Sequence, residues 1–261
     1  MNTSRRSFLK VAGLSAFALS SGMASLAGTA GAARAQIAPG RYEKGEHALT
    51  AKRWAMVIDT RLFRGPEDYE PLIEACHKVH NVPHIPGNQD IKWFWLDKYE
   101  RVFPDDMNAH INDKTRQASY PLLCNHCTNP SCVRVCPAGA TYKTGDGLVA
   151  IDYHRCVGCR FCMAACPYGS RSFNFQDPRP FIKDLNPAYP TRMRGVVEKC
   201  TFCAERLAAG QMPACVEAAG GKILFGDLED PNSTVRQALA ANYSIRRKPN
   251  LGTQPGVYYL I

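Results

Sequence analysis

Residues 156–167 read CVGCRFCMAACP, and this stretch decides the fold of the chain. Its four cysteines follow the spacing C-x2-C-x2-C-x3-C and are followed by a proline, which is a ligand pattern of [4Fe–4S] clusters. Three closely spaced thiolates on one loop can bind three iron corners of a cubane from one side. The fourth thiolate points elsewhere, and in proteins with two such clusters it ligates the other cluster. The pattern therefore predicts a pair of clusters.

A second motif of the same kind lies upstream, at residues 124–137, which read CNHCTNPSCVRVCP. Its spacing is C-x2-C-x4-C-x3-C, and a proline again follows. Between the two motifs, residues 145–147 (Gly-Asp-Gly) indicate a hairpin turn and residues 148–151 a short strand. We therefore expect a two-cluster, ferredoxin-like α+β domain at residues 119–176, in which each motif lends its last cysteine to the other cluster.

The chain contains twelve cysteines, of which eleven lie in three tight groups between Cys124 and Cys215, whereas Cys76 stands alone. Zinc ribbons separate their C-x2-C pairs by roughly a dozen residues or more, so a run that ends in Cys-Pro does not match them. Disulfides within C-x2-C-x2-C would be crowded. Iron–sulfur clusters are therefore favoured over a zinc site and over a disulfide framework.

The composition is that of a folded protein without a polyanionic partner. With 261 residues, 45% of them hydrophobic and 21% charged, the chain is neither disordered nor fibrous. The net charge is +9, but four positive charges lie in residues 1–35, which contain no acid, so the remainder carries +5. Three oxidised clusters with four thiolates each would bring the loaded protein to about −1. We therefore expect no nucleic-acid partner.

Residues 1–35 have the features of an export signal. Residues 4–10 read SRRSFLK, a Gly/Ala/Ser-rich stretch follows, and Ala33-Arg34-Ala35 resembles a cleavage site. The paired arginines resemble a twin-arginine signal, which places the protein in the periplasm or on the outer face of the cytoplasmic membrane. The alternatives are a basic amphipathic or membrane-spanning helix and an uncleaved signal anchor. No other segment is apolar enough to span a membrane, so we expect membrane contact through a partner.

The third cysteine group is Cys200, Cys203 and Cys215, with Ala219 where a fourth cysteine would stand. Here the chain resembles the iron–sulfur subunits of membrane-linked redox complexes related to polysulfide, tetrathionate and dimethyl sulfoxide reductases. The stretches that carry this resemblance are AMVID at residues 55–59, CNHC at 124–127, CTFC at 200–203, GD at 226–227 and GTQPGVYYL at 252–260.

Members of this family usually have four motifs and four clusters, and this chain departs from that pattern. Residues such as Phe63 and Pro66 stand where the first motif would be, and only Cys76 remains, at that motif's fourth position. The resemblance therefore implies three [4Fe–4S] clusters. Their ligands would be Cys124, Cys127, Cys132 and Cys166 for cluster A, Cys156, Cys159, Cys162 and Cys136 for cluster B, and Cys200, Cys203, Cys215 and Cys76 for cluster C. The alternative makes Cys76 a buried free thiol and the third cluster a [3Fe–4S] centre.

The resemblance also implies the architecture, an α+β fold of two ferredoxin-like domains with one inserted in the other, made of short strands and helices around the clusters. Residues 36–118 and 177–261 would form the split domain with one cluster and a C-terminal tail. Residues 177–190, rich in proline, are expected to be a surface loop, and residues 233–241 a helix. The tail would wrap a partner or the chain's own core.

Other polar residues near the cysteines have simpler interpretations. His126, between two ligands, is expected to donate a hydrogen bond. Lys199, Arg155 and Arg160 flank ligands, where positive charge would raise a reduction potential, but solvated surface charge is the simpler expectation. No C-x-x-C-H motif supports covalent haem at the three histidines near Cys76. These histidines are His77, His80 and His84.

The sequence predicts an electron-transfer subunit that is not an enzyme by itself, because it has no phosphate-binding glycine loop, Ser/His/Asp set or flavin fingerprint. The chain looks most like the DsrO-type periplasmic subunit of the Dsr membrane complex of dissimilatory sulfur metabolism. That resemblance implies two partners, a quinone-interacting integral membrane subunit and a multihaem cytochrome c. The alternatives are a subunit of a molybdenum-dependent polysulfide- or tetrathionate-type reductase and a free periplasmic ferredoxin.

Overall fold

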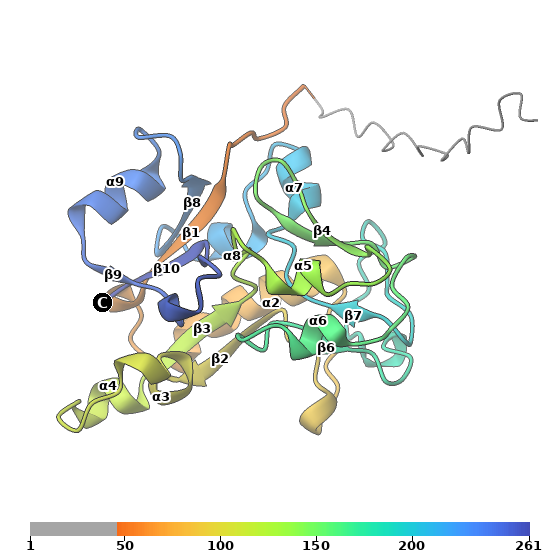
Figure 1. Cartoon of the computed structure of the whole chain (residues 1–261), viewed down its shortest axis with the longest axis horizontal. Helices are drawn as coiled ribbons and strands as arrows, with labels where there is room; N and C mark the ends of the chain where they lie inside the picture. Colours follow the sequence, from red (N-terminus) through yellow and green to blue (C-terminus); the bar gives the residue numbers. More distant parts are fainter. Residues whose placement is uncertain (1–45) are drawn as a thin grey trace, which may run out of the picture. The chain divides into compact units, whose positions relative to one another are not determined.

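A four-stranded sheet is the largest sheet in residues 46–261, the part of the chain that the computed structural model describes (Figure 1). Its strand order is β8 (Ile223–Asp227), β1 (Trp54–Asp59), β10 (Val257–Leu260) and β9 (Ser244–Ile245). β1 pairs antiparallel with β8 and parallel with β10. The first five residues of β1 are buried, as expected for a central strand that is covered on both faces.

Alternate side chains of β1 enter two different cores. Ala55 and Val57 pack with Val235 of helix α9 (Thr234–Ala241) on one face of the sheet. Met56 belongs to the main core on the other face, which also contains buried residues of helix α2 (Glu70–His80). α2 packs in turn against α8 (Ala214–Ala218). This packing brings Cys76 of α2 to the third cysteine group.

Three two-stranded sheets complete the strand content of the described residues. β2 (Phe94–Lys98) pairs with β3 (Ser119–Leu123), β4 (Thr141–Lys143) with β5 (Val149–Ile151), and β6 (Ser172–Phe173) with β7 (Val197–Glu198). The predicted hairpin is confirmed, because its turn connects β4 to β5. Gly147 in that turn has φ +88°, a conformation that favours glycine.

The remaining elements are short. The one-turn helices α5 (Ser131–Arg134) and α6 (Phe161–Ala164) follow the two cysteine loops and contact each other. The others are α3 (Tyr99–Val102), α4 (Asp113–Gln117), α7 (Ala204–Ala208), and the 3-10 helices η1 (Thr60–Leu62), η2 (Pro66–Tyr69), η3 (Gly87–Gln89), η4 (Pro104–Asp106), η5 (Arg179–Phe181) and η6 (Pro249–Leu251). Such short helices and small sheets form a mixed α+β fold, as predicted.

Two local predictions at the C-terminal side are confirmed. α9 occupies the predicted helical segment, and the Ser233 hydroxyl caps it by accepting a hydrogen bond from the Arg236 N–H. Residues 177–190 contain one 3-10 turn, η5, and otherwise lack helix or strand. The tail packs on the chain's own core, since β9 and β10 belong to the four-stranded sheet.

The division into an inserted and a split domain stays a prediction. The described residues all belong to one compact unit. Pairing of β2 with β3 and of β6 with β7 links the predicted inserted segment to both flanking segments. The predicted signal at residues 1–35 lies outside the described residues. No helix in the described part has the length and apolar character needed to cross a membrane.

Candidate iron–sulfur cluster sites

All twelve cysteines lie in the described part of the chain, and each of them is free. The disulfide alternative is therefore not realised. The fold gathers the cysteines into three groups of four, which we call sites A, B and C. The members of each group coincide with one of the ligand sets expected above.

Site A is a cavity lined by four cysteines from both motifs, Cys124, Cys127, Cys132 and Cys166. Burial, and then the neighbouring Cys124, Cys166 and Cys132, raise the pKa of the Cys127 thiol to about 12, although a hydrogen bond with Thr253 lowers it in part. Four thiolates this close and this buried need a compensating positive charge, and bound iron supplies it. The donor set therefore fits a cluster.

Asn125 gives a second sign that site A suits a bound group. It lines the same cavity and is 1% exposed. Neither its amide nitrogen nor its side-chain oxygen has a hydrogen-bond partner among the described residues. Buried polar groups without partners are rare, and cluster sulfurs accept hydrogen bonds from nearby N–H groups. A cluster in site A would satisfy the Asn125 amide.

Site B is a second cavity, lined by Cys136, Cys156, Cys159 and Cys162. Burial alone would raise the pKa of Cys136, but backbone N–H groups at residues 138, 140 and 141 outweigh it and lower the pKa. This loop therefore stabilises a thiolate, which is the form that binds metal. Cys159 is exposed, unlike every cysteine of site A, so site B lies nearest the surface.

Site C brings Cys76 to the third cysteine group. Burial raises the pKa of Cys76 well above its ordinary value, and Cys200, Cys215 and Cys203 raise it further. All four side chains are at most 7% exposed. Cys203 lies at the start of α7 and Cys215 within α8, so site C is built from three helices and the loop before α7. The buried Cys76 thiol lies close enough to the other three cysteines for their charges to affect its pKa, as expected of a fourth ligand.

His126 connects the loops of sites A and C. Its Nδ1 accepts a hydrogen bond from the Val149 N–H at 3.0 Å, and its Nε2 donates to the Cys200 carbonyl at 3.1 Å. Its ring stacks on Phe202, with 3.8 Å between centroids. Burial, and then the charge of Lys199, lower the pKa of His126 well below its ordinary value, so the ring is neutral. The expected role as a hydrogen-bond donor is confirmed.

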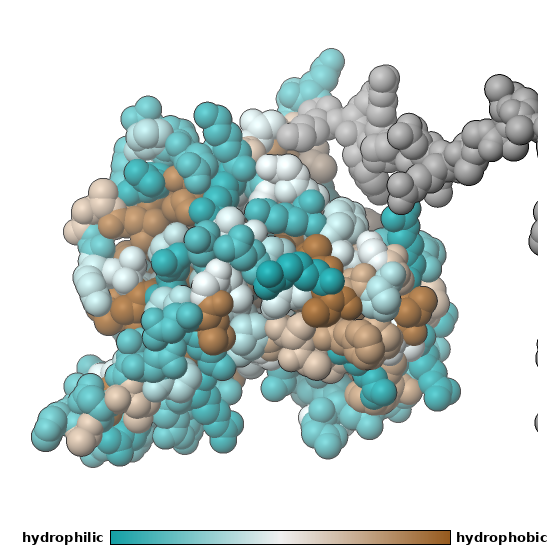
Figure 2. All heavy atoms as spheres, in the orientation of Figure 1, coloured by the Kyte–Doolittle hydropathy of each residue, from teal (hydrophilic) through white to brown (hydrophobic). Residues whose placement is uncertain are grey.

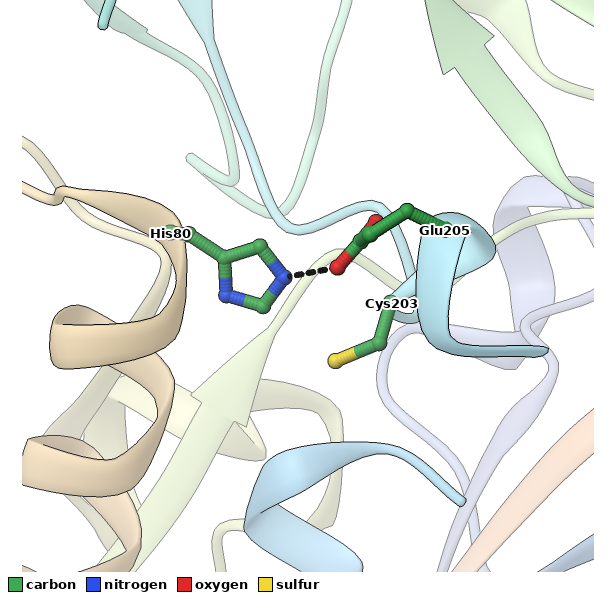
Figure 3. Close-up of side chains that lie close together, drawn as sticks. All are labelled: His80, Cys203 and Glu205. Atoms are coloured by element: carbon green, nitrogen blue, oxygen red, sulfur yellow. Dashed lines mark hydrogen bonds and ion pairs between the residues drawn. The ribbon is translucent and has the colours of Figure 1, made fainter. Parts of the chain in front are cut away.

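His80, Cys203 and Glu205 form a further group, drawn in Figure 3, whose ligand atoms lie within 4.8 Å of one another. His80 Nε2 lies 2.7 Å from Glu205 Oε1, and its Nδ1 lies 2.8 Å from the Cys76 carbonyl oxygen. Both ring nitrogens are therefore engaged, and Cys203 belongs to site C. The group is better described as support for site C than as a separate metal site.

Two buried cations lie beside the cysteines: Arg171, which was not among the predicted residues, and Lys199, which was wrongly expected at the surface. Arg171 is 5% exposed and donates from Nη2 to Cys132 Sγ at 3.1 Å, whereas Lys199 is 0% exposed and not a solvated surface charge. Arg155 and Arg160 are exposed, as expected. The available signal in the sequence was that each cation lies close to a predicted ligand, Arg171 to Cys166 and Lys199 to Cys200.

Comparisons with known proteins show which proteins this chain is similar to. Residues 116–178 match the family described as a 4Fe-4S dicluster domain. The chain is 41% identical to Hdr-like menaquinol oxidoreductase iron-sulfur subunit 1 of Archaeoglobus fulgidus, over 83% of this chain and 86% of the relative. It is 37% identical to the menaquinone reductase iron-sulfur cluster-binding subunit of Nitratidesulfovibrio vulgaris, over 80% and 88%. It is 33% identical to a tetrathionate reductase subunit of Salmonella typhimurium, over 100% and 89%.

Similarity of this extent covers the dicluster segment and both flanking segments. The resemblance noted from the cysteine motifs is thereby confirmed at the level of the family. The chain belongs to the family of iron–sulfur electron-transfer subunits of membrane-associated oxidoreductases, among them the menaquinol, dimethyl sulfoxide, tetrathionate and Hdr-like enzymes.

Proposed function

We propose that the chain holds three [4Fe–4S] clusters, at sites A, B and C, and passes electrons between two partner proteins. The observation that carries this proposal is the meeting of Cys76 with Cys200, Cys203 and Cys215, which leaves no cysteine outside a group of four. Each cluster supplies a one-electron couple, and the protein's part is to bind the clusters close together and set their potentials.

The contacts between sites support the order B, A, C. Cys132 of site A and Cys162 of site B share Arg171 as a neighbour. Burial raises the pKa of Cys200 in site C, and the next cause is Cys124 of site A. Site A therefore lies between the other two sites. Iron analysis and electron paramagnetic resonance (EPR) of the reduced protein test the count, with about twelve iron atoms and three centres expected.

The surface beside site B is the place proposed for the membrane partner. Val157, Phe161 and Phe175 are 69%, 59% and 42% exposed, and we call them the site B patch. Figure 2 shows brown and tan spheres over the region where Figure 1 draws α6 and β6. Exposed apolar patches mark interaction surfaces, and Cys159 is exposed in the same loop. The partner proposed is a quinone-interacting integral membrane subunit, which the menaquinol and menaquinone relatives support by their names.

The finer assignment is to the outer face of the cytoplasmic membrane, after twin-arginine export, in a complex of dissimilatory sulfur metabolism with a multihaem cytochrome c. The paired arginines at residues 5 and 6 and the DsrO-type resemblance support it. Gentle purification of the complex from membranes, followed by identification of its subunits, tests this assignment. A tetrathionate-type catalytic subunit in place of the cytochrome would favour the reductase alternative, and isolation of the chain alone would favour the free ferredoxin.

A further inference from the structure

Three buried cations in the described part of the chain, Arg171, Lys199 and Arg247, have no carboxylate partner. Arg247 donates to the carbonyls of Val102 and Tyr168, whereas the other two lie beside cysteines of the predicted sites. Arg171 is 5% exposed and Lys199 is 0% exposed, and in the described part of the chain neither lies within 4.0 Å of an acidic oxygen. The same interior contains a buried cation that is paired, since Arg192 Nε lies 2.7 Å from Glu198 Oε2. A buried charge is costly unless an opposite charge compensates it. The compensation for Arg171 and Lys199 must therefore come from something other than a carboxylate.

Arg171 lies at the junction of sites A and B. Its Nη2 donates to Cys132 Sγ of site A at 3.1 Å, and its Nη1 donates to Thr141 Oγ1 at 3.1 Å. Thr141 lines the cavity of site B together with Cys162. The guanidinium thus contacts a predicted ligand of cluster A directly and the lining of site B through Thr141.

Lys199 lies at the junction of sites A and C. Its Nζ donates to the carbonyl of Val149, and to the carbonyl of Cys200 at 2.8 Å. Val149 lines the cavity of site A, and Cys200 belongs to site C. His126, which is neutral, joins the same two residues and adds no charge. The ammonium is thus the positive group between these two sites.

We propose that Arg171 and Lys199 are counter-charges for the clusters, one at each junction of the order B, A, C, and that each raises the reduction potential of the two clusters it separates. This inference rests on the proposed three-cluster function. Reduction adds a negative charge to a cluster that is already negative, so a nearby fixed cation favours the reduced state, and burial strengthens the effect. The same cation weakens the repulsion between two reduced neighbours. The reduction potential of cluster A, which lies beside both cations, should rise most.

The test is an EPR-monitored redox titration of the loaded protein and two charge-removing variants. Arg171→Gln should lower the potentials of clusters A and B and leave C unchanged. Lys199→Met should lower the potentials of clusters A and C and leave the potential of cluster B unchanged. We expect at least a tenfold change in the ratio of oxidised to reduced cluster at fixed potential, which is about 59 mV for a one-electron couple. A general destabilisation of the fold would not lower the potentials of A and B in one variant and of A and C in the other.

Arg155→Gln is the matched control. Arg155 precedes Cys156 in sequence, but it is exposed and its Nε lies 3.3 Å from Asp152 Oδ2. Solvent and the carboxylate screen this charge, so its removal should leave the potential of cluster B nearly unchanged. A shift in cluster B as large as that of Arg171→Gln would overturn the role assigned to buried charge.

Two further results keep the proposal open to refutation. If Arg171→Gln loads fully but leaves A and B unchanged, or shifts all three clusters equally, the proposal is wrong. If that variant does not bind its clusters, the native protein labelled with 15N-arginine provides the test. Pulsed EPR of reduced cluster A should then show a 15N coupling that arises from the hydrogen bond between Arg171 and Cys132. The absence of this coupling refutes the contact. A native protein with fewer than three clusters refutes the proposed function instead, so the two failures are distinguishable.

Discussion

The imidazole of His80 lies 2.7 Å from the carboxylate of Glu205 and so joins α2 to α7 across 125 residues (Figure 3). Cys76, a predicted ligand of site C, lies on α2, and Cys203, another ligand of that site, is the N-cap residue directly before α7. The other ring nitrogen of His80 contacts the Cys76 carbonyl oxygen at 2.8 Å. The contact therefore sets the separation of two ligands that the sequence holds far apart.

Removal of this contact should weaken site C first. His80→Phe keeps a ring against Trp93, whose centroid lies 4.8 Å away, but it loses both hydrogen bonds. We expect the free energy of unfolding to fall by about 1–3 kcal/mol, with iron lost from site C before A and B. Thermal unfolding followed by EPR of the three centres measures this. Glu217→Gln, which breaks the exposed pair with Arg206, is the control and should cost less than about 1 kcal/mol. Equal loss from all three sites would contradict the prediction.

Cys76→Ala should change one cluster and spare two. The variant removes one of four buried thiols in site C, so iron should fall from about twelve per chain toward eight or eleven, for loss of the cluster or its conversion to a three-iron centre. The variant should also unfold more easily, because metal binding is coupled to folding. Iron analysis and EPR make the measurement, with Cys159→Ala as a control that should affect site B alone. An unchanged iron content and an unchanged EPR spectrum in Cys76→Ala would show that Cys76 is a free thiol and not a ligand.

The pair of Arg192 and Glu198 should be among the most sensitive positions for stability. Glu198 is 0% exposed and accepts hydrogen bonds from Arg192 Nε at 2.7 Å, Trp93 Nε1 at 3.0 Å and Asn174 Nδ2 at 2.6 Å. Arg192→Met leaves the Glu198 charge unpaired and should cost about 3–5 kcal/mol. Chemical denaturation measures this. The double variant Arg192→Met with Glu198→Gln should recover part of the loss, and a double variant that loses the sum of both single effects would argue against pairing.

The site B patch should be needed for membrane attachment. Val157→Asn with Phe161→Gln removes apolar surface without adding charge, so the clusters should stay intact while the protein moves from the membrane fraction to the soluble fraction at low salt. Tyr243→Asn is the control, because Tyr243 is 74% exposed but follows α9, far from this loop in sequence. Retention of the double variant in the membrane fraction would place the partner elsewhere.

The paired arginines should be required for export. Arg5→Lys with Arg6→Lys keeps the charge of the leader but removes the pair that twin-arginine transport recognises, so folded, brown protein should accumulate in the cytoplasm. Cell fractionation with iron analysis makes the measurement. Arg34→Lys serves as the control and should be exported normally. Normal export of the double variant would remove the support for this route.

Local signals account for what the sequence predicts well. The hairpin between β4 and β5 follows from a Gly-Asp-Gly turn, and α9 from a helix-like pattern of residues. The motifs of sites A and B follow from ligand spacings that span only a few residues. The residues alone left Cys76 open between a ligand and a free thiol. Cys76 reaches site C through the packing of α2 on α8, which the spacing of cysteines does not predict. Only the family resemblance therefore assigned Cys76 as a ligand.

Burial of charge was the part that sequence could not predict. Lys199 follows the buried Glu198, and nothing in this local pattern shows that the carbonyls of Val149 and Cys200 satisfy the ammonium. Arg171 likewise depends on the meeting of two cysteine loops. Both positions are set by contacts between segments distant in sequence, to which spacing rules do not apply.

The parallel pairing of β1 with β10 sets an order of events during protein synthesis. Thr60, just after β1, donates from Oγ1 to the Leu260 carbonyl, 200 residues further on, so β1 stays without that neighbour until the chain as far as Leu260 has left the ribosome. The cysteines of sites A and B all lie within residues 124–166, whereas site C waits for Cys215. A growing chain thus completes the cysteine sets of two sites first, then that of the third, and closes its largest sheet last.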